Sequence, residues 1–174
     1  MAYRRANRRE LRLGQFGNVK LVNLDRRGKL YLQPGELELV NQNLDEHGYI
    51  GGVQGLMADT SRIAREMDLD VKATTDAKFL EVGLSTKGDN VDYLLEQVVF
   101  RRGIDIRDCC FWGDEFTYLG PGVRGSDALM ITDRSIGADF FDVSEEPLEL
   151  PKEVHHVGGG VPSFLRFLES QSQQ

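Results

Sequence analysis

The stretch that decides the fold is Cys109–Asp127, CCFWGDEFTYLGPGVRGSD. It begins with the apolar run Cys109–Trp112, which predicts a strand buried on both faces. The run stops at Gly113-Asp114-Glu115, and a loop rich in glycine and proline continues from there. A strand that ends in acidic residues places carboxylates at its C-terminal edge, where ligands bind in open α/β sheets.

Two interpretations of this acidic turn stay open on the stretch alone. Asp114, with or without a second carboxylate, would be enough to hold Mg²⁺, which takes oxygen ligands and keeps several waters. An aspartate that follows a strand also commonly begins an ordinary turn. The sequence on either side of the stretch favours the first interpretation.

Composition sets limits on the class of protein. The chain has 174 residues, which is the length of one domain or of two small lobes. A net charge of −7 argues against a general nucleic-acid binder, and no apolar run has the length of a membrane span or a signal peptide. The two cysteines, Cys109 and Cys110, are neighbours whose side chains would point to opposite faces of a strand. A disulfide between them is therefore not expected, and a reducing, cytoplasmic setting fits best.

The first 84 residues predict a mixture of short strands and helices. Strand-like runs at Val19–Val22 and Leu30–Leu32 flank a turn, and helices are expected at Glu36–His47 and near Ala58–Met67. Val71–Leu84 is β-like. Five arginines near the start recur at near-helical spacing, which is typical of a solvated basic face. They are Arg4, Arg5, Arg8, Arg9 and Arg12.

The pattern changes at Ser85–Gly88, where a strand gives way to a helix. Lys87 falls in the first turn of that helix, where the helix macrodipole disfavours a cation. Local sequence leaves two interpretations open. Lys87 is either a surface lysine that tolerates a small cost, or a lysine that faces an anion such as phosphate together with the helix N-terminus.

The remaining C-terminal residues alternate between strands and helices, which predicts an α/β layer architecture. Ala128–Thr132 reads as a buried strand, and Ala138–Val143 as a shorter strand near an edge. Gly158–Ser163 reads as a plain turn that opens the last helix. His155 and His156 lack partners at metal-ligand spacing and are expected in a loop.

From Phe79 onward, the segments FLEVGLSTKG, CCFWGDEF, GSDALMIT, GADFFDVSEEP and GGVPSFLRFLE follow one another in an order that resembles haloacid dehalogenase (HAD) superfamily phosphatases. The similarity is to the C-terminal half of the sugar phosphatases with a large α/β cap, related to sucrose phosphatase and phosphomannomutase. Lys87 matches the family's third motif, and Gly113-Asp114 with Asp127 matches the fourth. The resemblance implies an α/β fold: the C-terminal half of a HAD-like Rossmannoid core at 85–174, preceded by an α+β cap remnant at 1–84.

The resemblance also implies a function and a set of site residues. It implies a Mg²⁺-dependent phosphatase, a hydrolase of a small phosphorylated metabolite of the sugar-phosphate class. Asp114 and Asp127 would bind the metal, Lys87 and Gly88 the phosphate, and Lys87 and Asp114 would be catalytic. Family members begin with a strand that ends in Asp-x-Asp-x-Thr, whose first aspartate attacks phosphorus. Residues 1–174 do not contain this motif, so the chain by itself is expected to be inactive.

Two functions therefore stand as expectations. One is the phosphatase. The alternative is a catalytically inactive remnant that binds a phosphorylated ligand or a partner chain. In the family's sheet the nucleophile strand lies beside the strand that ends at Asp114, so a chain without it would have an unpaired strand edge. We expect a homo-oligomer or association with the missing N-terminal segment, and neither a nucleic acid nor a membrane as partner.

Overall fold

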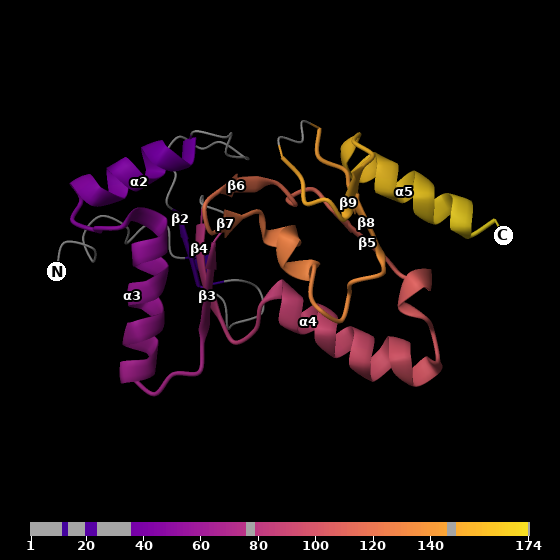
Figure 1. Ribbon diagram of the computed structural model, residues 1–174, viewed down its shortest axis with the longest axis horizontal. Helices are drawn as coiled ribbons and strands as arrows, with labels where there is room; N and C mark the ends of the chain where they lie inside the picture. Colours follow the sequence, from indigo (N-terminus) through magenta and orange to yellow (C-terminus); the bar gives the residue numbers. More distant parts are fainter. Residues whose placement is uncertain (1–11, 14–19, 24–35, 76–78, 146–148, 174) are drawn as a thin grey trace. The chain divides into compact units, whose positions relative to one another are not determined.

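The computed structural model describes residues 12–13, 20–23, 36–75, 79–145 and 149–173 (Figure 1). The backbone forms two compact units, of which the first comprises Met1–Thr86 with Leu119–Arg124 and the second Lys87–Tyr118 with Gly125–Gln174. Antiparallel strands occur in the first unit and parallel strands in the second. The predicted mixed α/β class is therefore confirmed.

The first unit contains a four-stranded antiparallel sheet. Its strands are β1 (Arg12–Leu13), β2 (Lys20–Asn23), β3 (Lys72–Thr75) and β4 (Phe79–Gly83), in the order β1-β2-β4-β3. The β-like stretch Val71–Leu84 is thus two paired strands, β3 and β4.

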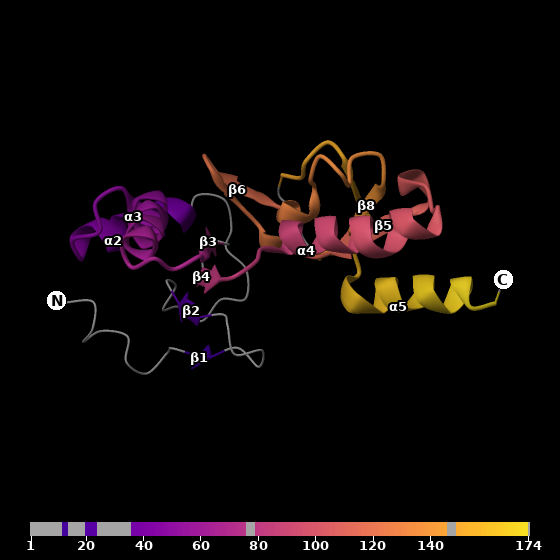
Figure 2. The ribbon, with the colours of Figure 1, turned by 90° about the horizontal axis from the view of Figure 1, so that it is seen from below.

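Two helices, α2 (Glu36–Glu46) and α3 (Gly52–Glu66), cover one face of this sheet (Figures 1 and 2). Apolar side chains from both helices, from β4 and from β7 (Val123–Arg124) make the core of the unit. These core residues are Leu37, Val40, Leu44, Val53, Leu56, Leu80 and Val123.

Helix α3 begins at Gly52, well before the predicted start near Ala58, so that prediction was wrong about the boundary. The cause is capping from the preceding helix. Asp45 Oδ1 accepts hydrogen bonds from the backbone N–H groups of Gly51 (3.1 Å) and Gly52 (3.3 Å), and Asn41 Oδ1 accepts the next one (3.0 Å). The first N–H groups of a helix need such partners, and here side chains of the preceding helix supply them.

Several expectations for the N-terminal region fall outside the described residues. Arg12 lies in strand β1 rather than in a helix. The other four arginines of the series lie outside the described ranges, as do Val19 and the predicted strand Leu30–Leu32.

The second unit contains a three-stranded parallel sheet. Its strands are β5 (Cys110–Gly113), β8 (Asp139–Asp142) and β9 (Val154–His156), in the order β5-β8-β9. The register pairs the last residues of the three strands, so Gly113 lies opposite Asp142 and Asp142 opposite His156. Between β5 and β8 the chain forms a two-stranded ribbon, β6 (Tyr118–Gly120) with β7, which belongs to the first unit except for Tyr118.

Three predictions for this sheet need correction. Strand β8 was expected near an edge, but it lies between β5 and β9, and its residues Phe140 and Asp142 are buried. His155 and His156 belong to β9 and not to a loop. Strand β5 was expected to be buried on both faces, but among the described strands it pairs only with β8, and Cys110 is exposed.

The predicted strand Ala128–Thr132 is also wrong, because Ser126–Met130 forms a 3₁₀ helix. The apolar composition misled the prediction, and the backbone hydrogen bonds explain the outcome. The Ser135 hydroxyl accepts from the N–H of Thr132 (2.7 Å) and donates to the carbonyl of Met130 (2.7 Å). The N–H of Thr132 and the carbonyl of Met130 therefore have hydrogen-bond partners without needing a neighbouring strand.

Helices α4 (Lys87–Leu94) and α5 (Gly160–Gln171) complete the second unit. α4 continues through a π-helical turn and a 3₁₀ turn to Arg102. α5 contacts one face of the parallel sheet (Figure 2). There the ring centroid of Trp112 lies 4.8 Å from that of Phe167 and 5.6 Å from that of Phe164. The opposite face carries a second core built around Phe116, Phe140 and Val154.

Candidate functional site

The structure brings three of the predicted site residues together within the second unit. Lys87 is the first residue of α4, Asp114 follows the end of β5, and Asp127 lies in the 3₁₀ helix that begins at Ser126. Lys87 Nζ lies 2.6 Å from Asp127 Oδ1. Asp127 Oδ2 accepts the backbone N–H groups of Asp114 (2.9 Å) and Glu115 (3.0 Å).

Asp127 therefore joins the start of a helix to the end of a strand. Its carboxylate is buried, whereas the Lys87 side chain is 46% exposed. A buried charge is tolerated when it is paired and hydrogen-bonded. Both oxygens of Asp127 meet that condition, because one pairs with the ammonium and the other with the acidic turn.

The acidic turn and Asp127 can approach each other only because Gly113, directly before Asp114, and Gly125, two residues before Asp127, have no side chain. A Cβ at Gly113 would collide with the Asp127 carboxylate, and a Cβ at Gly125 would collide with the Glu115 carbonyl. The second collision would be with backbone, which cannot move aside as a side-chain tip can. Both positions therefore require glycine, because the neighbouring groups lie too close for a Cβ.

Two further residues of this site were not predicted from the sequence. Lys87 Nζ donates to Ser126 Oγ (2.7 Å), and the Ser126 hydroxyl donates to Glu115 Oε2 (2.6 Å). Ser126 stands in the GSD segment beside a predicted residue, which is a weak signal. Glu115 adjoins Asp114, but only the folded loop shows that its carboxylate reaches Ser126.

The geometry leaves Lys87 one donor for a ligand. An ammonium group carries three N–H bonds. Among the residues that the structure describes, Asp127 and Ser126 take two of them. The third can meet an anion while the other two hold the ammonium in place.

No group of three or more His, Cys, Asp or Glu side chains in the described ranges has the arrangement of a metal site. Magnesium needs fewer protein ligands, since one or two carboxylates and several waters suffice. Asp114 and Asp127 supply hard oxygen donors of the kind that Mg²⁺ prefers. Each carboxylate oxygen has two acceptor sites, so Asp127 Oδ1 keeps capacity beside Lys87. Gly88 is buried in the first turn of α4, and its role at a phosphate stays a prediction.

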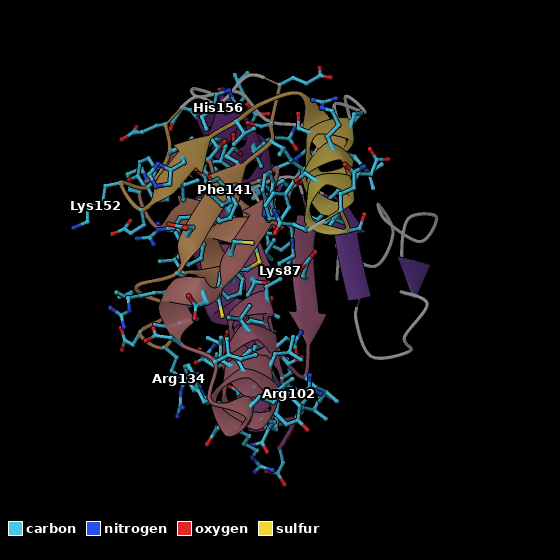
Figure 3. The ribbon with its side chains drawn as sticks, turned by 90° about the vertical axis from the view of Figure 1, so that its right-hand side faces the viewer. Lys87, Arg102, Arg134, Phe141, Lys152 and His156 are labelled. Atoms are coloured by element: carbon cyan, nitrogen blue, oxygen red, sulfur yellow. The ribbon has the colours of Figure 1, made fainter. Side chains whose placement is uncertain are left out.

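A second polar cluster, also missed from the sequence, lies at the ends of β8 and β9. Asp142 is fully buried, and its Oδ2 accepts from the Ser144 hydroxyl (2.6 Å) and contacts His156 Nδ1 (2.8 Å). Asp142 Oδ1 has no hydrogen-bond partner within the described residues. Figure 3 shows that His156 lies apart from Lys87.

Comparison with models of protein families, with curated proteins and with solved structures gives no match to this chain. The class that can be stated is a mixed α/β protein with a Lys–Asp pair at the carboxyl end of a parallel strand. No helix within the described ranges is long and apolar enough to cross a membrane.

Proposed function

We propose that this chain carries part of the active site of a Mg²⁺-dependent, HAD-type phosphatase, a hydrolase of small phosphorylated metabolites of the sugar-phosphate class. The observation that supports the proposal best is the Lys87 ammonium, held 2.6 Å from Asp127 beside the acidic turn after β5. Lys87 and Asp114 are the catalytic residues of the proposal. Lys87 and Gly88 bind the phosphate, and Asp114 and Asp127 bind the metal.

Phosphoryl transfer requires little covalent chemistry from a protein. Catalysis depends mainly on positioning the reacting groups and stabilising their charge. A cation that is already fixed stabilises the developing negative charge without rearranging during the reaction. Lys87 meets this requirement, because Asp127 and Ser126 anchor its ammonium and, as far as the described residues go, leave one donor for the phosphoryl oxygens.

Asp114 is the first carboxylate after β5 and would hold the metal, with Asp127 supporting it. Bound Mg²⁺ supplies a Lewis acid and a template for the phosphoryl group. Asp127 also fixes the acidic turn through its two backbone hydrogen bonds, so its role in the proposal is positioning as well as binding.

Residues 1–174 do not contain the nucleophile of such a site, because no apolar segment here ends in Asp-x-Asp-x-Thr. In the proposal it comes from a further strand beside β5, supplied by another chain or segment. The chain by itself then shows no phosphatase turnover.

A second candidate is a protein that binds a phosphorylated ligand or a partner chain without catalysis. The position of β5 favours it, because β5 pairs only with β8 among the described strands. Such an edge is a template for another chain. This candidate keeps Lys87 as the anion-binding residue and needs no nucleophile.

Calorimetry with Mg²⁺ and with inorganic phosphate tests the site that both candidates share. We expect Asp114→Ala to abolish Mg²⁺ binding, because it removes the leading carboxylate. Lys87→Ala should weaken phosphate binding and leave Mg²⁺ binding in place. Asp133→Ala and Lys152→Ala, at exposed positions, are the matched controls and should change neither affinity.

Two outcomes would count against the proposal. If Asp114→Ala binds Mg²⁺ as tightly as the parent chain, the metal assignment is wrong. Steady hydrolysis of p-nitrophenyl phosphate by the isolated chain, lost in Asp114→Ala, would contradict the assignment of the nucleophile to another strand.

A further inference from the structure

The Asp142–His156 pair places one ring nitrogen of a histidine against a buried carboxylate. His156 Nδ1 lies 2.8 Å from Asp142 Oδ2, which also accepts the Ser144 hydroxyl. An ionised carboxylate only accepts hydrogen bonds, so this contact is a hydrogen bond in the tautomer that carries its proton on Nδ1, and Nε2 of that tautomer carries a lone pair. A carboxylate that holds a histidine in this way orients the ring and stabilises positive charge on it.

Burial makes the carboxylate act through the imidazole. Asp142 is 0% exposed, whereas the His156 side chain is 37% exposed. Solvent molecules and small reagents therefore reach the ring and not the carboxylate. Asp142 Oδ1 has no partner within the described residues, so the contacts of this carboxylate run through Oδ2.

The backbone at Gly158 lies close to His156 Nε2. A Cβ at Gly158 would lie 3.1 Å from Nε2, so glycine avoids a tight contact with the ring. The next residue, Gly159, is flanked by Ser163 and by the Arg166 guanidinium, whose Nη2 donates to Ser163 Oγ (2.8 Å). A guanidinium and a hydroxyl are suited to the oxygens of a phosphoryl group.

We propose that His156 Nε2 is a phosphoryl-accepting site, separate from the Lys87–Asp127 cluster and independent of the function proposed above. The donor is a small phosphoramidate or acyl phosphate. The Nε2 lone pair forms the N–P bond while the bond from phosphorus to the leaving group breaks, and the leaving group takes that electron pair and, from solvent, a proton. Nδ1 keeps its proton, and Asp142 stabilises the positive ring that forms during the attack.

His155 is the matched control within the same strand. Its side chain lies on the opposite face of the sheet from His156, and its ring centroid lies 6.0 Å from that of Phe141. No carboxylate contacts His155 among the residues that the structure describes. His155 and His156 therefore differ in whether a carboxylate contacts the ring, which is the feature that the proposal depends on.

The test is reaction of the full chain with potassium phosphoramidate, followed by ³¹P NMR and by peptide mass spectrometry. We expect Nε2-phosphohistidine at His156, formed at least about tenfold faster than phosphohistidine at His155, in line with the effect of an oriented acid–base partner. His156→Gln should lose the fast signal, and His155→Gln should keep it. Equal labelling of His155 and His156, or labelling of His156 at Nδ1, would overturn the proposal.

Asp142 is a positioning residue in this proposal, and its role has its own readout. Asp142→Asn should slow phosphorylation of His156 by about tenfold, while the emission of Trp112, the single tryptophan, shows whether the unit has folded. Because Asp142 is buried and the variant could fail to fold, ¹⁵N shifts of the parent histidines provide a second measurement. Protonated Nδ1 and unprotonated Nε2 at His156 support the proposal. The reverse tautomer overturns it.

Discussion

At the scale of single residues, Asp127 shows how much one carboxylate can organise. It accepts from the ammonium of Lys87 and from two backbone N–H groups of the acidic turn. Charge-assisted hydrogen bonds of this kind are about twice as strong as neutral ones. Loss of the carboxylate would release the helix start and the acidic turn together.

The two cysteines should differ in reactivity although they are neighbours. Burial raises the pKa of Cys109, and the negative charge of Asp108 raises it further, whereas Cys110 is exposed. The thiolate is the reactive form. We therefore expect iodoacetamide near neutral pH to modify Cys110 first, and Cys109 only as the pH rises, as measured by peptide mass spectrometry.

Cys110→Ser isolates the second thiol and supplies the control. The rate of Cys109 alkylation in this variant should rise at a higher pH than the rate for free cysteine. Rapid alkylation of Cys109 at neutral pH would show that the thiol is not held in the half-buried position described for it.

At the scale of elements, the turn after β5 depends on the absence of a side chain. We expect Gly113→Ala to destabilise the second unit by about 1–3 kcal/mol, the usual range for overpacking. The added Cβ collides with the Asp127 carboxylate and must displace it from Lys87. Urea denaturation followed by Trp112 emission measures the change.

Gly103→Ala is the control for this prediction. Gly103 has a φ of +71°, but a Cβ there would meet nothing within 4 Å. Its substitution should cost about 1 kcal/mol through backbone conformation alone. If Gly113→Ala and Gly103→Ala lowered the free energy of unfolding equally, the collision at Gly113 would contribute no destabilisation of its own.

Sequence patterns that span only a few residues predicted several helices and strands correctly. The apolar period of Glu36–His47 marked α2, the run Phe79–Val82 marked β4, and the change after Ser85 placed Lys87 at a helix start. The last helix was also expected near Gly158–Ser163 and begins at Gly160. In each case the signal lies within the element or at its boundary.

The missed elements depend on side chains that lie outside the segments concerned. Side chains of α2 cap α3, and Ser135 satisfies the backbone after the 3₁₀ helix that resembled a strand. The same limit applies to the site. The order of motifs singled out Lys87, Asp114 and Asp127, but no local pattern connects Asp142 with His156, since only the register of β8 and β9 makes them neighbours. The roles assigned to the first three stay predictions.

At the scale of the whole molecule, strand β5 lies at an edge of the described parallel sheet. It pairs with β8 alone among the described strands, and Cys110 is exposed upon it. Open strand edges are templates for association, and closed two-fold dimers are the commonest result. We expect light scattering on the isolated chain to give a mass above that of the monomer, rising with concentration.

Cys110→Lys tests whether β5 is the contact. A lysine on an edge strand opposes pairing with another chain, so this variant should move the mass toward that of the monomer. Lys152→Ala, at an exposed position elsewhere, should leave the mass unchanged. A monomer mass for the parent chain at micromolar and millimolar concentrations alike would contradict the expectation.

The two glycines beside the contact between Asp127 and the acidic turn also limit which residues this chain can accept over evolutionary time. Gly113 and Gly125 each stand where a Cβ would strike the carboxylate or the backbone that completes the Lys87–Asp127 link. Most surface positions of the chain can accept many residue types, but these two can accept one while that link lasts. A distant descendant that kept the link would therefore carry glycine directly before the acidic pair and two places before the final aspartate, however little else of its sequence still resembled this one.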